Sequence, residues 1–390
     1  DKKIKYVITL DTDSNLVLNS ILDLVGCMAH PLNKPVLNTE QTKVEKGYGI
    51  MQPRISIDIE STNKSLYSQI FAGIGGFDTY SAIVPNINQD LFGEGNFVGK
   101  GIYDLEICDK ILYNTFPDNL ILSHDLLEGN YLRCAYVADI ELYEEFPSEF
   151  LMDVPRHHRW ARGDVQILSF IFSKIKNKVG NFVKNPLNLL EKFKILDNIC
   201  RIFLYPALLL ILILISATKY KYLFLGLIFI EIALPIIIFL KNKLYNRKSN
   251  LMTIYYKNIL FGGKALLLRT LIVFATIPYY SALYLDAFFR SIYRLFISHK
   301  NLLNWTTAEE VEKTTKTNLF NYIKNFNISI VISLTVLVIG ILTNTILLIV
   351  FSVVFLLAPI LVYLVSKNIN YPKEKLNSYK LDDIIHIARN

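Results

Sequence analysis

The segment Tyr6-Val-Ile-Thr-Leu-Asp-Thr-Asp13 joins a short apolar run directly to two carboxylates. The run at residues 6–10 is uncharged and β-rich, which predicts a buried parallel strand. Open α/β sheets bind ligands beyond the carboxyl ends of their strands, where Asp11 and Asp13 stand. Residues two apart in an extended segment point to the same side, so this pair could hold one hard cation, Mg²⁺ or Mn²⁺. Most Asp-x-Asp triplets are solvated turns, and that alternative stays open.

A second acidic segment, Ser123-His-Asp-Leu-Leu-Glu128, follows another apolar run. Ser123 is a predicted N-cap, with a helix from about His124. Asp125 would then lie in the first turn, where the helix dipole favours the ionised carboxylate that a general base needs. The alternative is an ordinary helix start with acidic residues in its first turn.

The segment Arg156-His-His-Arg-Trp-Ala-Arg-Gly-Asp164 is basic and precedes the apolar half of the chain. Arg159 has the fork of donors that suits a pyrophosphate, and Trp160 offers a flat apolar face to a sugar. The alternative is a juxtamembrane basic patch at lipid headgroups. The glycine-rich segment at residues 93–101 does not have the glycine and lysine spacing of a P-loop. We expect it to form a close-packed turn near the substrate.

Apolar residues divide the 390-residue chain into a soluble half and a membrane half. Runs long enough to span a bilayer lie at 199–217, 222–240, 328–343 and 346–366. Residues 264–296 are apolar but interrupted by charges, which predicts amphipathic helices at the interface. Basic clusters before the first run and after the second predict that both flanks are cytoplasmic. We attribute the net charge of +7 to this topology and expect no nucleic-acid partner.

These patterns predict six segments along the chain. Residues 1–170 form a cytosolic α/β core, and residues 171–198 form a juxtamembrane interfacial segment. Residues 199–240 and 328–366 each form two transmembrane helices. Residues 241–327 form a cytoplasmic loop with interfacial helices, and residues 367–390 form a cytoplasmic tail that could begin a further module.

The order of the three motifs resembles that of processive, inverting glycosyltransferases such as cellulose and hyaluronan synthases. A closer resemblance, over nearly all of the chain, is to the cyclic β-1,2-glucan synthase family. It is carried by the phrases VITLDTD, LVGCMAHPLN, GYGIMQPR, QDLFGEGNFVGKGIYD, ILSHDLLEG, DIELYEEFPS, RHHRWARGD and NLLNWTTA. This resemblance implies a GT-A-like α/β fold, UDP-glucose as donor, a glucan acceptor and β-1,2 linkages made with inversion. It also implies a multi-pass protein of the bacterial inner (cytoplasmic) membrane with its catalytic domain in the cytoplasm.

The resemblance further implies a role for each motif. Asp11 and Asp13 would bind the metal and the nucleotide, and Asp125 would be the catalytic base. The QxxRW motif of the wider superfamily maps to Arg156, Arg159 and Trp160, which would bind substrate. Two departures stand out: Arg156 replaces the Gln of that motif, and the first strand of the fold, with its nucleotide-binding Asp, is expected before residue 1. Three other functions stay open: a membrane polysaccharide synthase with another sugar or linkage, a transport or channel component, and an inactive binding subunit.

Overall fold

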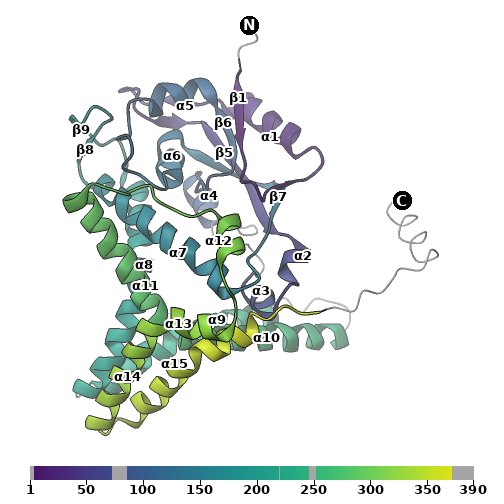
Figure 1. Ribbon diagram of the computed structural model, residues 1–390. Helices are drawn as coiled ribbons and strands as arrows, with labels where there is room; N and C mark the ends of the chain where they lie inside the picture. The colour runs from purple at the N-terminus through teal and green to yellow at the C-terminus, as the bar shows by residue number, and fades with distance from the viewer. Residues whose placement is uncertain (1–3, 73–85, 219, 246–251, 371–390) are drawn as a thin grey trace.

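A computed structural model describes residues 4–72, 86–218, 220–245 and 252–370 of the chain (Figure 1). A globular part that holds the strands lies at one end, and long helices extend from it at the other. The strands are β1 Tyr6–Thr9, β2 Asn15–Leu16, β3 Val36–Leu37, β4 Val44–Lys46, β5 Ile50–Ile57, β6 Gly101–Asp104, β7 Cys134–Glu144, β8 Lys174–Lys176 and β9 Phe182–Lys184. The helices of the globular part are α1 Ser20–Ala29, α2 Ile59–Thr62, α3 Leu66–Phe71, α4 Ile87–Phe92, α5 Leu105–Leu112, α6 Asp125–Leu132 and α7 Phe150–Gln166.

Within the described residues, the main sheet is mixed, with strand order β1-β6-β5-β7-β2. The long central strands β5 and β7 are parallel, whereas the other neighbouring pairs are antiparallel. One face packs against α1 through Leu24, Met28 and Met51. The other face packs against α6 through Ile50 and Leu127. Helices therefore cover both faces, as the α/β composition predicts.

The prediction of a buried parallel strand at residues 6–10 is wrong. β1 pairs antiparallel with β6 and is an outer strand of the described sheet. Tyr6 and Ile8 pack on the core, while the intervening Val7 is 37% exposed. A short apolar run does not reveal the direction of its neighbour, and only the sheet pairing distinguishes the two cases.

The second half of the chain is helical. Its helices are α8 Leu189–Ala217, α9 Lys221–Tyr245, α10 Met252–Ala275, α11 Ile277–Tyr293, α12 Ala308–Thr314, α13 Leu319–Asn325, α14 Asn327–Leu342 and α15 Ile346–Val365. The four predicted spans lie in α8, α9, α14 and α15. Residues 264–296 form the end of α10 and α11, which meet at a bend of 58°. The predicted tail lies, from residue 371 onward, outside the described residues.

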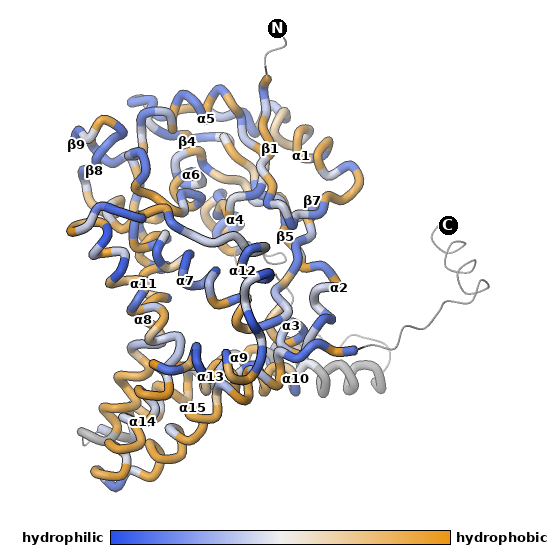
Figure 2. The backbone as a smooth tube through the Cα atoms, viewed as in Figure 1, coloured by the Kyte–Doolittle hydropathy of each residue, from blue (hydrophilic) through white to orange (hydrophobic). Residues whose placement is uncertain are grey.

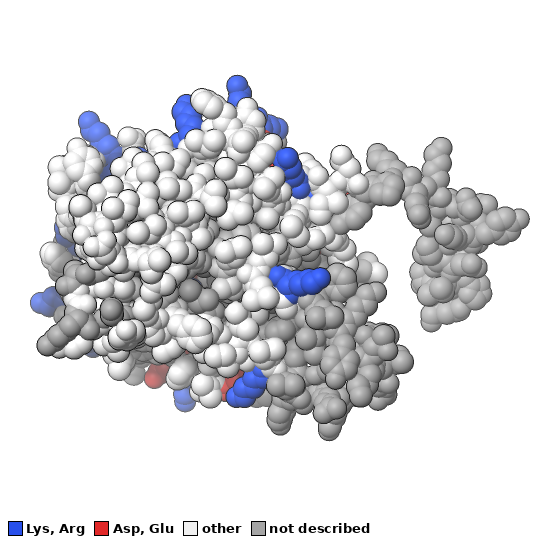
Figure 3. Space-filling model, turned by 90° about the horizontal axis from the view of Figure 1, so that it is seen from below, with Lys and Arg blue, Asp and Glu red and all other residues white. Residues whose placement is uncertain are grey.

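Among the described residues, two helices, α8 and α15, are long and apolar enough to cross a membrane. The number rises to four if each of two bent pairs, α10 with α11 and α13 with α14, is one span. The apolar residues gather on the helices farthest from the sheet (Figure 2). Seen from that end, the described surface is mostly uncharged, with most of the Lys and Arg, and a few Asp or Glu atoms, near its edge (Figure 3). Such a distribution matches a protein whose helical end enters the bilayer while basic residues stay at its border.

The helical and globular parts share one hydrophobic core. Phe150, at the start of α7, has its ring centroid 5.8 Å from that of Tyr280 in α11 and 5.7 Å from that of Phe326 next to α14. Buried Tyr67 of α3 and Val362 of α15 belong to the same cluster. The globular part is therefore fixed against the apolar helices through α7.

Candidate active site

β1 ends in a turn that presents Asp11. The backbone N–H of Ser14 donates to the carbonyl oxygen of Asp11 at 3.1 Å, and the backbone N–H of Asp11 donates to Ser14 Oγ at 3.2 Å. Residues 11–14 are thus a turn and not the extended segment that we expected, because a serine at the fourth position can close it. The Asp11 side chain is 57% exposed and free to meet a ligand on its solvent side.

Lys100 bridges Asp11 to a buried carboxylate at the end of β7. Its Nζ lies 2.9 Å from Asp11 Oδ2 and 3.0 Å from Glu144 Oε1, and Ser14 Oγ donates to that same glutamate oxygen at 3.2 Å. Burial raises the pKa of Glu144, Lys100 opposes the rise, and the charges of Asp13 and Asp11 add to it. Asp11 therefore shares Lys100 with Glu144, and the charge of Asp13 also acts on Glu144. Burial works against the charged form of Lys100, but Glu144 and Asp11 together raise its pKa, so the ammonium stays charged.

Asp125 is the first residue of α6, at the positive end of the helix. His124 occupies the N-cap position, so the prediction of Ser123 as N-cap is wrong. The Oγ of Ser123 instead lies 3.5 Å from Asp125 Oδ2. Burial raises the pKa of Asp125, and the charge of Glu128 acts in the same direction, against that of His124. Gly99 has φ +93°, and a Cβ there would lie 3.3 Å from Asp125 Oδ2. The glycine lets the backbone approach the carboxylate, which is more basic than an ordinary one despite the helix dipole.

His124, Asp125 and Glu128 place their ligand atoms within 4.8 Å of one another, so this group could in principle hold a cation. Both oxygens of Glu128 already have partners, however. Tyr103 Oη donates to one at 2.6 Å, and His124 Nδ1 lies 2.9 Å from the other. We therefore interpret the group as a network that fixes the start of α6, and assign no metal to it.

The charges of the same two aspartates also act on Arg159 of α7. The charges of Asp11 and Asp125 raise its pKa against the larger lowering effects of burial and of Arg156. Its guanidinium carbon lies 4.7 Å from the ring centroid of Trp305, an arrangement that fixes the direction of the cation. Arg159, Asp11 and Asp125 thus act on one another although they come from three distant parts of the chain.

Trp305 belongs to the loop at residues 299–307, which lies along α7. Arg162 Nη2 donates to the carbonyl oxygen of Asn304 at 2.6 Å, and Gln166 Nε2 donates to that of Leu302 at 3.1 Å. Two side chains of α7 therefore hold the loop beside Arg159.

The remaining residues of the basic motif make contacts within the fold. His157 Nε2 lies 3.2 Å from the buried carboxylate of Asp153, and the Trp160 ring packs edge-on against His157 at 5.4 Å. His158 Nε2 lies 2.8 Å from Asp286 of α11. The two histidines thus contact separate carboxylates.

The structure therefore brings Asp11 and Asp125 to two adjacent residues: Lys100 Nζ contacts Asp11, and the backbone of Gly99 lies against Asp125. The charges of Asp11 and Asp125 act on Arg159, and the charge of Asp13 acts on Glu144. Trp160 lies on α7 one residue beyond Arg159, with its ring against His157. Sequence reasoning missed Lys100, Glu144 and Trp305. The first stands in the glycine-rich segment that we had interpreted only as a turn, and the others stand in quoted phrases to which no role was given.

No protein-family model matches the chain. It is 32% identical over 326 residues to the cyclic beta-(1,2)-glucan synthase NdvB of Rhizobium meliloti (strain 1021), a match that covers 82% of this chain and 11% of that protein. The chain thus spans only about a tenth of the length of this relative. Through this segment the chain belongs to the cyclic β-1,2-glucan synthase family.

Proposed function

We propose that this chain is the sugar-transfer part of a membrane glucan synthase, which adds glucose from UDP-glucose to a growing β-1,2-glucan with inversion. The observation that supports it most is the surroundings of Asp125, a carboxylate of raised pKa: the backbone of Gly99 lies against it, Lys100 next to that glycine contacts Asp11 after β1, and its charge acts on Arg159. A base beside an anion-binding cluster is what transfer from a nucleotide sugar needs. A mixed sheet with helices on both faces is consistent with a GT-A-like domain.

The cations would bind the diphosphate of the donor. Arg159 can hold two phosphate oxygens at once through its fork, and Lys100 adds a point charge. Asp11 and Asp13 offer the oxygen donors that Mg²⁺ and Mn²⁺ prefer, next to the further negative charge of Glu144, so the residues present fit such an ion. When bound, the ion would help to neutralise the charge that develops on the departing diphosphate.

Asp125 would act as the base. It takes the proton of the acceptor 2-hydroxyl while that oxygen forms a bond to the anomeric carbon and the bond from that carbon to the diphosphate breaks. UDP leaves with the electron pair, so one displacement inverts the anomeric centre. Trp160 and Trp305 are the aromatic residues that would orient the sugars, and orientation contributes several kcal/mol to such steps, about 7–11 in the best cases.

The proposed function is tested with the full-length protein in bilayer vesicles, given labelled UDP-glucose and Mg²⁺ or Mn²⁺. We expect label in a polymer whose linkage analysis gives 1,2-linked glucose. Another linkage would favour a different membrane polysaccharide synthase. Absence of incorporation from any nucleotide sugar would contradict the proposal and favour a binding or transport component. We further propose, from the family, that the protein lies in the bacterial inner membrane with this domain in the cytoplasm.

A further inference from the structure

A hollow of about 530 Å³ lies beside the candidate active site, between α5 and residues 113–124. Its volume is in the range of about 300–1,000 Å³ that small-molecule sites occupy. His124, next to Asp125 in the chain, lines it, and so does Leu303 from the loop that carries Trp305. The hollow therefore begins beside the start of α6, one residue from Asp125, which is not itself a lining residue.

The lining combines aromatic rings with charges. Tyr113 is 65% exposed, and Lys178 Nζ lies 4.9 Å from its ring centroid. Asp118 Oδ1 lies 3.5 Å from the same Nζ. Phe116 packs edge-on against buried Tyr131 at 5.3 Å. A pyranose has C–H groups on its faces and hydroxyls at its edge, and it matches a surface that combines aromatic rings with donors and acceptors.

The two sides of the hollow are held in place independently of any ligand. The backbone N–H of Lys178 donates to the carbonyl oxygen of Asn114 at 3.2 Å, which ties the segment between β8 and β9 to the end of α5. On the other side, the bond from Gln166 to Leu302 places Leu303. A preformed surface of this kind binds without a large ordering cost.

We propose that this hollow is a subsite for the acceptor glucan, which binds sugar units beyond the one whose hydroxyl faces Asp125. The proposal rests on the proposed function. The donor is a poorer occupant, because the groups suited to its diphosphate, Asp11, Lys100 and Arg159, are not among the lining residues. A glucan extending from Asp125 past His124 would reach Tyr113 and Lys178 at the far side.

The test measures kcat/KM of the full-length protein for a β-1,2-linked disaccharide and for a longer β-1,2-gluco-oligosaccharide. Tyr113→Ala should lower kcat/KM about tenfold for the long acceptor, equivalent to ~1.4 kcal/mol, and leave the disaccharide nearly unaffected. Tyr113→Phe keeps the ring and should behave as wild type. Phe182→Ala is the matched control, since Phe182 is also an exposed ring beneath a lysine, Lys176, but lies outside the hollow.

An equal loss for both acceptors, or no loss for either, would overturn the subsite. If the wild-type protein transfers glucose to neither acceptor, the proposed function fails, and the subsite is then decided by labelling. A long oligosaccharide with a photoreactive group at its far end should label residues 113–124 in the wild-type and Tyr113→Phe proteins, and not in Tyr113→Ala. Labelling elsewhere, or labelling that an excess of the same unmodified oligosaccharide does not displace, contradicts the proposal.

Discussion

At the scale of single residues, the account depends first on Asp125. Replacement by Asn keeps the shape of the side chain and removes its ability to accept a proton. We expect Asp125→Asn to lower kcat by about 10²–10⁴-fold while UDP binding, measured by titration calorimetry, stays intact. Asp139→Asn, at an exposed carboxylate of β7, is the control. Transfer at the wild-type rate by Asp125→Asn would remove this residue as the base.

The charge of Glu128 tunes that base. Asp125 must be ionised to work, so transfer rises with pH through its pKa, and burial and Glu128 both raise that pKa. Glu128→Gln removes one of these causes, so the acidic limb of the profile of kcat/KM against pH should move to lower pH. The change also removes the partner of His124. The charge of His124 lowers the pKa of Asp125, but by less than the charge of Glu128 raises it. A limb that stays in place or moves to higher pH would show that another group titrates.

Lys100 is expected to act on the donor. Its ammonium is held by buried Glu144 and directed at Asp11. Lys100→Ala should weaken UDP binding and raise KM for the donor by about tenfold or more, because a charge-assisted contact contributes roughly 1.5–3 kcal/mol. Lys100→Arg should restore part of the affinity. Unchanged UDP affinity in Lys100→Ala would mean that the lysine only compensates the charge of Glu144.

At the scale of elements, the sequence predicted where a helix begins better than it predicted which strands pair and in which direction. The start of α6 differs by one residue from the expected start, because acidic first-turn residues mark a helix N-terminus locally. The direction of β1 was missed because it depends on β6, which lies about 90 residues farther along the chain. Lys100 and Glu144 were missed for the same reason. A lysine in a glycine-rich turn and a glutamate at a strand end acquire a role only when the sheet brings them together.

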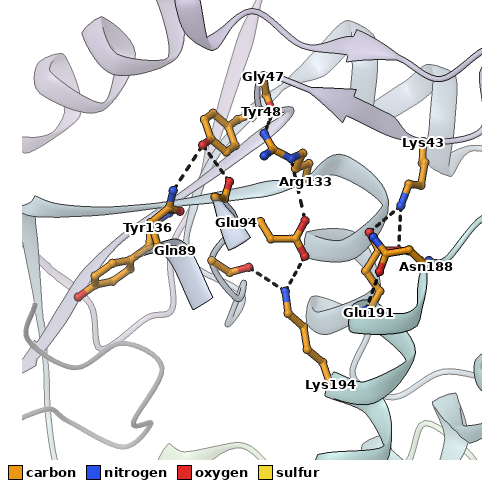
Figure 4. Close-up of polar contacts among 12 residues, drawn as sticks. Lys43, Gly47, Tyr48, Gln89, Glu94, Arg133, Tyr136, Asn188, Glu191 and Lys194 are labelled. Atoms are coloured by element: carbon orange, nitrogen blue, oxygen red, sulfur yellow. Dashed lines mark hydrogen bonds and ion pairs between the residues drawn. The ribbon is translucent and has the colours of Figure 1, made fainter. Parts of the chain in front are cut away.

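The first turns of α8 are fixed to the globular part by buried ion pairs. Lys194 Nζ lies 3.0 Å from Glu94 Oε1, both side chains are nearly fully buried, and a second pair joins Lys43 to Glu191 at 2.7 Å (Figure 4). Lys194→Met leaves the charge of Glu94 buried, with Arg133 only at 4.0 Å. The expected loss of stability is about 3 kcal/mol, the low end for breaking a buried pair.

Thermal unfolding in detergent measures this loss. The double variant Lys194→Met/Glu94→Gln should recover part of it, since the orphaned charge is gone. Lys184→Met is the control: its 2.8 Å contact with Glu40 is exposed, and the expected change is below about 1 kcal/mol. Similar losses of stability in Lys194→Met and Lys184→Met would contradict the expectation that a buried ion pair costs more to break than an exposed one.

At the scale of the whole molecule, one core joins the charged site to the membrane helices. α7 carries Arg159 toward the site and Phe150 into the cluster that contains Tyr280 and Phe326. The loop with Trp305 follows α11 and returns to α7. Sugar transfer would therefore occur at a fixed place relative to the apolar end of the molecule.

The central claim is that residues from four separate segments surround one nucleotide sugar. A cryo-electron-microscopy structure of the full-length protein with UDP and Mn²⁺ tests it most directly. The account predicts diphosphate density between Asp11, Lys100 and Arg159, with the ion at Asp11 and Asp13 and with Asp125 facing the side from which an acceptor enters. Diphosphate bound away from Lys100 and Arg159, or separated from Asp125 by intervening protein, would contradict it.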